Sequence, residues 1–547
     1  MKSIYYTPLI IPRRFLRLCA LLVPVLFLAA CTDHFEDLNK NPAGFPTISP
    51  GVQLTKIQAD LSGNREDVWR YDLAISSPLI QHLAGSWWTQ HGGQYRILDK
   101  GQWYTLWETT YPRDLKNVQD LVERTTGDPA LVNINSAARI MRVYIYSRLT
   151  DVYGDIPYSQ AIKGYTEKIF LPKYDSQEEI YTNFFKELDE AVKAMDPAKG
   201  NVQGDVFYDG NVDKWIKFGN SLRLRLGFRL TKIKPELARQ QVEAAIAGGV
   251  MGSNTYSCVM RHESINFTIG DNRGNGRSQV FQADVSSSGF RLTNTLVDYM
   301  KATKDPRLTI YGGTYLPVNG SEAIDNSNNL DITPYLQEGL AYGAMSWNVW
   351  MPDQTITLAS GDKVVVPTAY RRMQPSKYVA ALNAPFFHLT YAEVELLLAE
   401  AAARGWGGQT DAEGHFMKAV QAACESMSSY PNAPTISQAS IDELKGSFTP
   451  FPTTFDDQME AIHGQMWVNF FLNGTEAYAN YRRTGYPKLV PFTSVDWYTS
   501  GTNGVMPRRF FYPESEAVQN PTNYTDAVGR LGGQDDWLKR VWWDKEE

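Results

Sequence analysis

The sequence predicts a mainly α-helical fold, in which helix pairs form a scaffold and a loop-rich insert carries a small β element. Three observations support this. Apolar residues recur at three- and four-residue spacing over about 52–250 and again over about 385–485. Helix-start and helix-stop residues punctuate both regions. Between them, over about 251–384, Gly, Asn, Ser and Pro become frequent and the helical periodicity fades.

The first thirty residues have the pattern of a secretory signal peptide. Four basic residues precede the apolar run Leu18–Ala30, which is too short and wrongly flanked for a membrane-spanning helix. The run ends Leu28-Ala29-Ala30-Cys31, which resembles a bacterial lipobox, whose cysteine is acylated and becomes the mature first residue. Acylation of Cys31 predicts an anchored protein. The alternative is an ordinary signal peptide with an incidental cysteine.

An acidic cluster, Asp33–Asp37, follows Cys31. It resembles the surface-export signal of lipoproteins in Bacteroidetes-type bacteria, and predicts an outer-membrane protein that faces the exterior; the alternative is a solvated linker. Removing residues 1–30 deletes four basic and no acidic side chains, which takes the formal net charge from −7 to −11. Such an acidic chain argues against nucleic acid as a partner.

Helices account for most of residues 52–250. Val52–Ala84 has a helical pattern, Trp103 and Trp107 begin a helix that continues to Val122, and Ala137–Val152 forms the next helix, which Gly154 and Pro157 end. Ser176 and Glu179 form a capping box before a run with apolar residues every four positions. Trp215–Leu230 contains the alternating run SLRLRL; a strand is the alternative, but the four-residue spacing continues through it and favours a helix. Pro235 opens the helix that ends at Gly248. Alternating antiparallel helices of this kind are typical of tetratricopeptide-like packing.

The insert and the second helical region follow. Arg291–Thr303 predicts a short helix, and the segments 356–358 and 363–366 predict a hairpin around Ser360-Gly361-Asp362. Further helices are expected at Thr390–Arg404, where Thr390 and Glu393 supply the cap, from Asp411 to about Met427, and at Phe455–Phe471 and Thr475–Arg483. The tail from Pro487 is expected to be mostly loop.

Several of these segments carry a family resemblance. DVYGDIPY, YDSQEEIY and W-x-K-F-x-N-S-L-R-L-R-L resemble the SusD/RagB family of bacterial surface lipoproteins. TYAEVELLLAEAAARGW, the stretch Glu460–Pro487 and RRFFYPESEAVQN resemble later segments of the same family. The segment CTDHFEDLNKNP is most similar to the second SusD-like subfamily of this family, whose ligands are diverse.

The resemblance implies a single binding domain, residues 31–547, with a tetratricopeptide-like scaffold. It implies a protein without catalytic activity or cofactor that captures oligo- or polysaccharide and delivers it to a SusC-like TonB-dependent outer-membrane transporter. Two alternatives remain open: a subunit of the same transporter class that captures peptides or acts as a structural lid, and a surface glycoside hydrolase. The sequence contains no G-x-S-x-G, H-E-x-x-H or Walker A motif, whereas paired carboxylates can meet in space without any sequence motif.

Glycan binding needs flat aromatic rings, on which the C–H faces of sugars stack, and polar side chains around them. The family places its ligand contacts in an early loop and in the central insert. The candidates here are Trp87, Trp88, Tyr95, Tyr342, Trp347, Asn348 and Trp350. For each large aromatic residue the alternative is core packing. Trp103, Trp107, Trp215 and Trp467 stand at helical spacing and are predicted to lie in the core.

Other conspicuous residues receive structural interpretations. Arg482 and Arg483 are expected to bond carboxylates and helix carbonyls. Glu393, Glu395 and Glu400 are expected to cap a helix and to lie on its solvated surface. The loop Asn272–Arg277 could bind an anionic sugar but lacks the full phosphate-loop pattern, so a plain turn is preferred. Cys258 and Cys424 are expected to be small buried side chains, and whether they pair stays open. No metal site is predicted, because neither Asp325–Asn329 nor Asp535-Asp536 has the spacing of a calcium loop.

Overall fold

Antiparallel helix pairs build the scaffold, as the apolar periodicity predicts. The computed structural model describes residues 48–268, 271–283, 289–317, 329–345, 352–492 and 500–546. Residues from Pro50 onward form one compact unit. The signal-peptide residues and Cys31 lie outside the described residues. Among the described residues, no helix combines the length and the apolar character that crossing a membrane requires.

The first scaffold region runs from residue 50 to residue 248. Its longer helices are α3 (Pro50–Leu61), α7 (Gly101–Thr109), α8 (Lys116–Thr125), α9 (Val132–Tyr153), α10 (Gln177–Ala194), α11 (Val212–Arg229) and α12 (Pro235–Gly248). The short helix α4 (Arg65–Val68) leads into the π-helix η1 (Trp69–Ser76), and a second π-helix, η3 (Thr110–Leu115), joins α7 to α8. The break in the predicted Trp103–Val122 helix contains Pro112, which lacks the backbone N–H of a regular turn.

Local sequence signals determine several helix boundaries. The Ser176 side chain accepts a hydrogen bond from the Glu179 backbone N–H, and the Glu179 carboxylate accepts one from the Ser176 backbone N–H, so the predicted capping box is present. The run SLRLRL lies inside α11, which confirms the helix and excludes the strand. Gly154, at φ +85°, ends α9, because that conformation costs glycine little.

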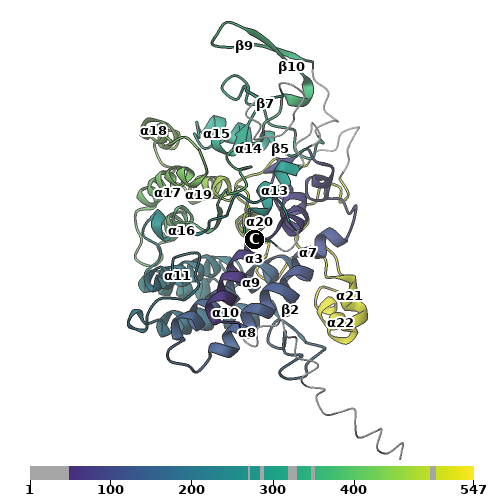
Figure 1. Ribbon diagram of the computed structural model, residues 1–547, viewed down its shortest axis with the longest axis vertical. Coiled ribbons are helices and arrows are strands. Elements are labelled where there is room, and N and C mark those ends of the chain that lie inside the picture. The colour runs from purple at the N-terminus through teal and green to yellow at the C-terminus, as the bar shows by residue number, and fades with distance from the viewer. Residues whose placement is uncertain are drawn as a thin grey trace, which may run out of the picture. The chain divides into compact units, whose positions relative to one another are not determined.

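The second scaffold region comprises α16 (Tyr391–Ala403), α17 (Ala412–Ser426), α18 (Gln438–Gly446), α19 (Phe455–Asn469) and α20 (Gly474–Thr484). In Figure 1, α16 lies between α11 and α17, so the two scaffold regions join into one helical stack. Asp411 caps α17 through the backbone N–H of Gly414, as predicted.

The insert holds short elements. They are β4 (Cys258–Met260), α13 (Gly276–Ala283), β5 (Arg291–Leu292), α14 (Asn294–Ala302), α15 (Leu308–Tyr311), β6 (Gly312–Gly313), β7 (Tyr315–Leu316), β8 (Leu330–Asp331), β9 (Gln354–Thr357), β10 (Lys363–Val366), β11 (Gln374–Pro375) and β12 (Phe386–Leu389). The predicted hairpin is confirmed: β9 and β10 pair antiparallel, with Ile356 opposite Val364. The hairpin projects from one end of the ribbon in Figure 1. It packs on its own small apolar cluster of Ile332, Leu336, Ile356 and Val366.

One prediction of secondary structure was wrong. Arg291 and Leu292 form strand β5, which pairs with β1 (Leu83–Ala84), and the helix begins only at Asn294, where Thr293 supplies the cap. The described tail is mostly loop, as predicted, and contains two short helices, α21 (Glu514–Gln519) and α22 (Pro521–Arg530). Farther along the tail, Trp543 is fully buried, and its indole N–H donates to Asp151 Oδ1 at 2.9 Å.

Buried ion pairs cross-link the helical stack, and they correct the prediction for the three glutamates of α16. Glu393, Glu395 and Glu400 are all buried rather than solvated. Thr390 caps the helix as predicted, but the Glu393 carboxylate accepts two hydrogen bonds from Arg225 of α11, each 2.6 Å long. The reason for the error is that each of these carboxylates has a partner outside α16, which the local sequence does not reveal.

Arg482 and Arg483 behave as predicted. Arg483 forms a bidentate pair with Glu400, both bonds 2.8 Å long. Arg482 donates to the backbone carbonyls of Arg508 at 2.8 Å and Asp151 at 2.5 Å. The four tryptophans predicted for the core, Trp103, Trp107, Trp215 and Trp467, are buried. Cys258 and Cys424 are buried free thiols.

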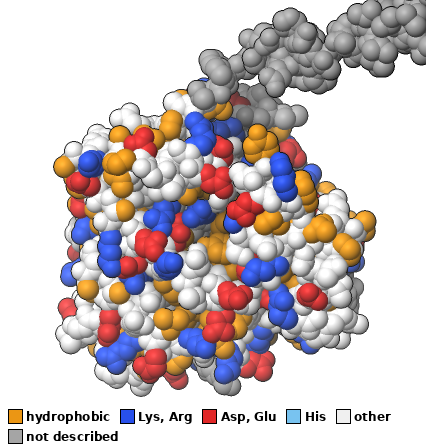
Figure 2. Space-filling view, turned by 90° about the horizontal axis from the view of Figure 1, so that it is seen from below, with side chains coloured by type: hydrophobic (Ala, Val, Ile, Leu, Met, Phe, Trp, Pro, Cys, Tyr) orange, Lys and Arg blue, Asp and Glu red, His pale blue; other side chains and the backbone are white. Residues whose placement is uncertain are grey.

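The face shown in Figure 2 carries acidic and basic side chains interspersed, with no large patch of one sign. This face therefore lacks the continuous basic surface on which nucleic-acid binding depends.

Candidate functional site

Two adjacent tryptophans, Trp87 and Trp88, mark the candidate site. After strand β1, residues Trp87–Thr89 form the short 3-10 helix η2, and α6 (Gln90–Gly93) follows it. Half of the Trp87 surface is exposed. Trp88 is partly buried and meets Trp69, the first residue of the π-helix η1, edge to face with the ring centroids 4.9 Å apart. We refer to Trp69, Trp87 and Trp88 as the tryptophan platform.

The platform rests on a close contact between α6 and η1. A Cβ on Gly92 would lie 2.1 Å from the backbone oxygen of Ile75, so only glycine allows the two segments to approach this closely. His91 is buried beneath Trp88, with the two rings parallel and their centroids 6.3 Å apart. Burial lowers the pKa of His91 to about 4, so its imidazole is neutral at physiological pH. His91 therefore adds no charge beneath Trp88.

The early loop and the central insert meet next to this platform. The sequence predicts ligand contacts in each segment but not that the two segments are neighbours. The backbone N–H of Gly85 donates to the carbonyl of Ala344 at 3.1 Å. The side chain of Gln94 donates to the carbonyl of Gly343 at 2.7 Å. The structure thus brings the early loop and the described part of the insert into one place.

Tyr95 and Tyr342 join the two segments from the inside. Both rings are buried, with centroids 6.4 Å apart, and each also packs on Phe492. Burial raises the pKa of Tyr95 to about 12, so the phenol stays protonated. In this conformation the two tyrosines hold the segments together. Trp347, Asn348 and Trp350 lie outside the described residues, and their role as ligand contacts stays a prediction.

Trp69 is the platform residue that the sequence analysis missed. It stands in a region with a plain helical pattern, and nothing in its immediate sequence predicts contact with Trp88. The available signal is structural: π-helical turns inside α-helical regions are frequent at functional sites. Arg70, the next residue, lies with its guanidinium carbon 5.7 Å from the Trp69 ring centroid.

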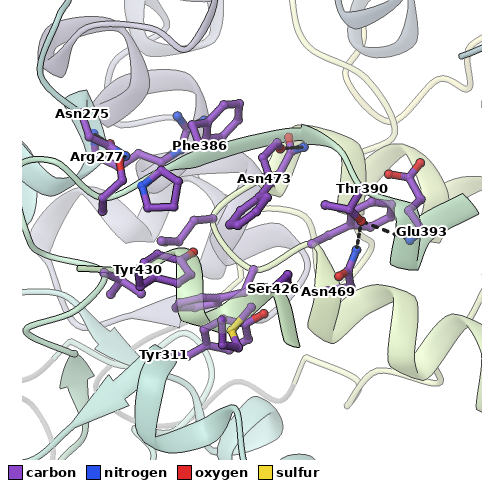
Figure 3. Close-up of a pocket in the computed structure, with 18 of the residues that line it drawn as sticks. Asn275, Arg277, Tyr311, Phe386, Thr390, Glu393, Ser426, Tyr430, Asn469 and Asn473 are labelled. Carbon is purple, nitrogen blue, oxygen red and sulfur yellow. Dashed lines mark hydrogen bonds between the residues drawn. The ribbon is translucent and has the colours of Figure 1, made fainter. Parts of the chain in front are cut away.

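A second hollow, shown in Figure 3, lies among Tyr311, Phe386, Tyr430 and Asn469. Its volume is about 20 Å³, close to the space that one water molecule needs. Arg277, at one side, is committed to the scaffold, because it bonds Asp72 and stacks 4.0 Å from the Phe386 ring centroid. Arg277 belongs to the loop considered for anionic sugars, and it serves packing. This hollow is too small for a sugar ring.

In the described ranges, no group of three or more His, Cys, Asp or Glu side chains could hold a metal ion.

The chain is a mainly helical protein that presents an aromatic platform where a loop and an insert meet. It belongs to the SusD-like family: the family model described as "Starch-binding associating with outer membrane" matches residues 42–513. The resemblance inferred from the sequence motifs is confirmed.

Solved structures agree with this assignment. A chitin-binding protein is 36% identical with a TM-score of 0.77, and the alignment covers 91% of this chain and 100% of that one. A structure titled "Bacteroidetes AC2a SusD-like" is 28% identical with a TM-score of 0.83 and the same coverage. A chitin-binding SusD homolog from Flavobacterium johnsoniae, 22% identical over 91% of this chain and 98% of that one, with a TM-score of 0.69, shares the fold. No curated protein matches the chain.

Proposed function

We propose that this protein is a cell-surface lipoprotein that captures a glycan at the tryptophan platform and delivers it to a SusC-like TonB-dependent transporter, without catalysis. The observation that carries the proposal is the half-exposed ring of Trp87 beside the Trp69–Trp88 pair, at the meeting point of the early loop and the insert. Large aromatic side chains are usually buried, so an exposed tryptophan on a rigid support favours a binding role.

The chemistry of the platform suits sugars. The flat rings offer apolar faces to sugar C–H groups, and the neutral His91 below them introduces no charge. The chitin-binding protein that is 36% identical to this chain makes β-linked N-acetylglucosamine oligosaccharides the first ligands to test. In this proposal Trp347, Asn348 and Trp350 complete the insert side of the site, and Tyr95 and Tyr342 hold its two sides together.

A lipid anchor at Cys31 and a SusC-like transporter as partner are the other two parts of the proposed function. Acylation of Cys31 would tether a single binding domain, residues 31–547, to the outer membrane, facing the cell exterior. From there the protein would act as a lid that closes on the transporter and passes the glycan inward. The family description, which names association with the outer membrane, supports this placement.

The test is glycan binding by the purified protein and by its Trp87→Ala and Trp88→Ala variants. Chitooligosaccharides, starch fragments and other oligosaccharides are titrated calorimetrically, and released sugars are measured in parallel. Losing one stacked ring should cost about 1–3 kcal/mol, or roughly ten- to hundred-fold in affinity. Tyr165→Ala is the matched control, because Tyr165 is 90% exposed on a different loop. That variant should bind like the parent.

Binding to one glycan class, lost in the platform variants and without release of product, would support capture. Equal affinity in the parent and both platform variants would refute the site. Release of product, abolished by one Asp or Glu substitution, would refute the non-catalytic role. Affinity purification from cells expressing the protein with its neighbouring outer-membrane components tests the partner: failure to retain a TonB-dependent transporter would contradict delivery.

A further inference from the structure

A polar pocket lies on the scaffold, built from residues that take no part in the tryptophan platform. Its volume is about 460 Å³, within the range of about 300–1,000 Å³ that small-molecule sites occupy. Three segments form most of its walls: the loop Asp205–Asp209 before α11, the stretch from Asn254 to Arg261 that contains β4, and the C-terminal end of α17 with the 3-10 helix Met427–Ser429. Lys214 of α11 and Phe387 of β12 complete the lining.

Several polar groups on these walls have no hydrogen-bond partner among the described residues. Within the part of the chain that the structure describes, the side chains of Asp209, Lys214 and Arg261 make no hydrogen bond or ion pair. Asn254 donates its amide to the carbonyl of Ala422 at 3.0 Å, but its Oδ1 is buried without a hydrogen-bond donor.

Other polar groups on the pocket walls already have hydrogen-bond partners within the protein, and these bonds hold the walls in place. Asp205 accepts hydrogen bonds from the backbone N–H groups of Phe207 and Gly210 and from the indole of Trp215. The Ser428 hydroxyl donates to the carbonyl of Glu425 at 2.8 Å. The loop and the end of α17 are therefore fixed, and the unengaged side chains stand on a preformed frame.

We propose that this pocket binds a single neutral sugar ring. Sugar hydroxyls donate and accept at once, and the pocket offers Lys214 and Arg261 as donors and Asp209 as an acceptor. Three acidic and two basic side chains line the pocket, so their charges nearly cancel and the lining does not strongly favour ions of one sign. The partly buried ring of Phe387 supplies an apolar surface for a C–H face.

The choice of a sugar as ligand class rests on the proposed function, whereas the pocket itself does not. A site of this kind would give the protein two contacts with one polysaccharide, or with two chains of it. Two linked contacts raise the overall affinity for a long glycan beyond that of either site alone.

The experiment measures binding of free monosaccharides to the purified protein by saturation-transfer NMR and titration. N-acetylglucosamine, glucose and galactose are offered singly, and glucuronate is the charged comparison. Asp209→Asn and Arg261→Ala should each weaken binding of a neutral sugar by tenfold or more, with an unchanged melting temperature. Arg239→Ala, on an exposed arginine of α12, is the matched control and should leave binding unchanged.

A variant with both Trp87→Ala and Trp88→Ala separates the two sites. Monosaccharide binding that survives in this double variant and is lost in Arg261→Ala would support the second pocket. The pocket is refuted if Asp209→Asn and Arg261→Ala bind like the parent, if only glucuronate binds, or if all monosaccharide binding disappears in the double variant. In the first case, oligosaccharide binding that still depends on Trp87 leaves the proposed function intact.

Discussion

Replacing Glu400 by leucine tests how much of the scaffold depends on buried ion pairs. Glu400 is fully buried, accepts both guanidinium bonds of Arg483 at 2.8 Å and one from Arg404 at 2.9 Å, and lies 3.3 Å from His463 Nε2. Burial favours the protonated acid, but Arg483, Arg404 and His463 outweigh burial and hold the pKa of Glu400 well below its usual range. The carboxylate is therefore ionised in the folded protein.

The expected magnitude follows from the group left behind. In Glu400→Leu the guanidinium of Arg483 keeps only its 3.0 Å bond to Asn480 and stays buried without a counter-ion. Breaking a buried pair in this way costs about 3–5 kcal/mol. Unfolding entropy of about 2.1 cal/mol/K per residue over about 500 residues gives roughly 1 kcal/mol/K, so the melting temperature should fall by about 3–5 °C.

The assay is a double-mutant cycle followed by scanning calorimetry at neutral pH. Arg483→Met should destabilise by a similar amount, because it leaves Glu400 without its bidentate partner. The double variant should recover most of the loss, since replacing both charges with apolar groups of similar volume is often neutral. Additive losses in the double variant, or single variants that melt like the parent, would refute the reasoning.

Three further predictions concern other buried groups. Burial lowers the pKa of His82 to about 3 and that of His91 to about 4. Below about pH 6.5 the unfolded chain therefore takes up protons that the folded chain does not, and the free energy of unfolding should fall by about 1.4 kcal/mol per pH unit per histidine. The melting temperature, measured against pH, tests this. Gly92→Ala should lose glycan binding together with a few degrees of melting temperature, because its Cβ would collide with the π-helix. Cys258 and Cys424 should resist a thiol reagent in the native protein and react fully after denaturation, because both are buried and burial raises the pKa of each thiol.

Each of these has its own control. His82→Gln should flatten the slope of stability between pH 6.5 and 4, and an unchanged slope would show that other groups cause it. Gly127→Ala creates no contact within 4 Å, although its positive φ carries a small backbone cost, so it should leave glycan binding intact. Rapid labelling of either native cysteine would contradict its burial.

The sequence predicted those features that depend on neighbouring residues. Ser176 and Glu179 stand three positions apart, and their capping box follows from that spacing alone. The four-residue apolar spacing within Trp215–Leu230 identified a helix despite its alternating stretch. Such signals are local, so no knowledge of the fold is needed to interpret them.

Features that depend on distant partners could not be predicted. Glu393 looks like a solvated helix residue until Arg225, 168 positions away, is placed beside it. The Trp69–Trp88 contact likewise depends on how the π-helix lies against the early loop. Nothing in the sequence of the early loop or of the insert indicates that Gly85 bonds Ala344, the contact that brings the two segments together.

The hairpin β9–β10 is stabilised separately from the helical stack, because its apolar cluster is small and distinct from the main core. A two-stranded hairpin is marginally stable, and local opening of such a unit costs far less free energy than global unfolding. Amide hydrogens at Ile356 and Val364 should therefore exchange with solvent long before those of α9 or α16. The hairpin can open, be cut by a protease or be replaced by another sequence while the helical stack remains folded.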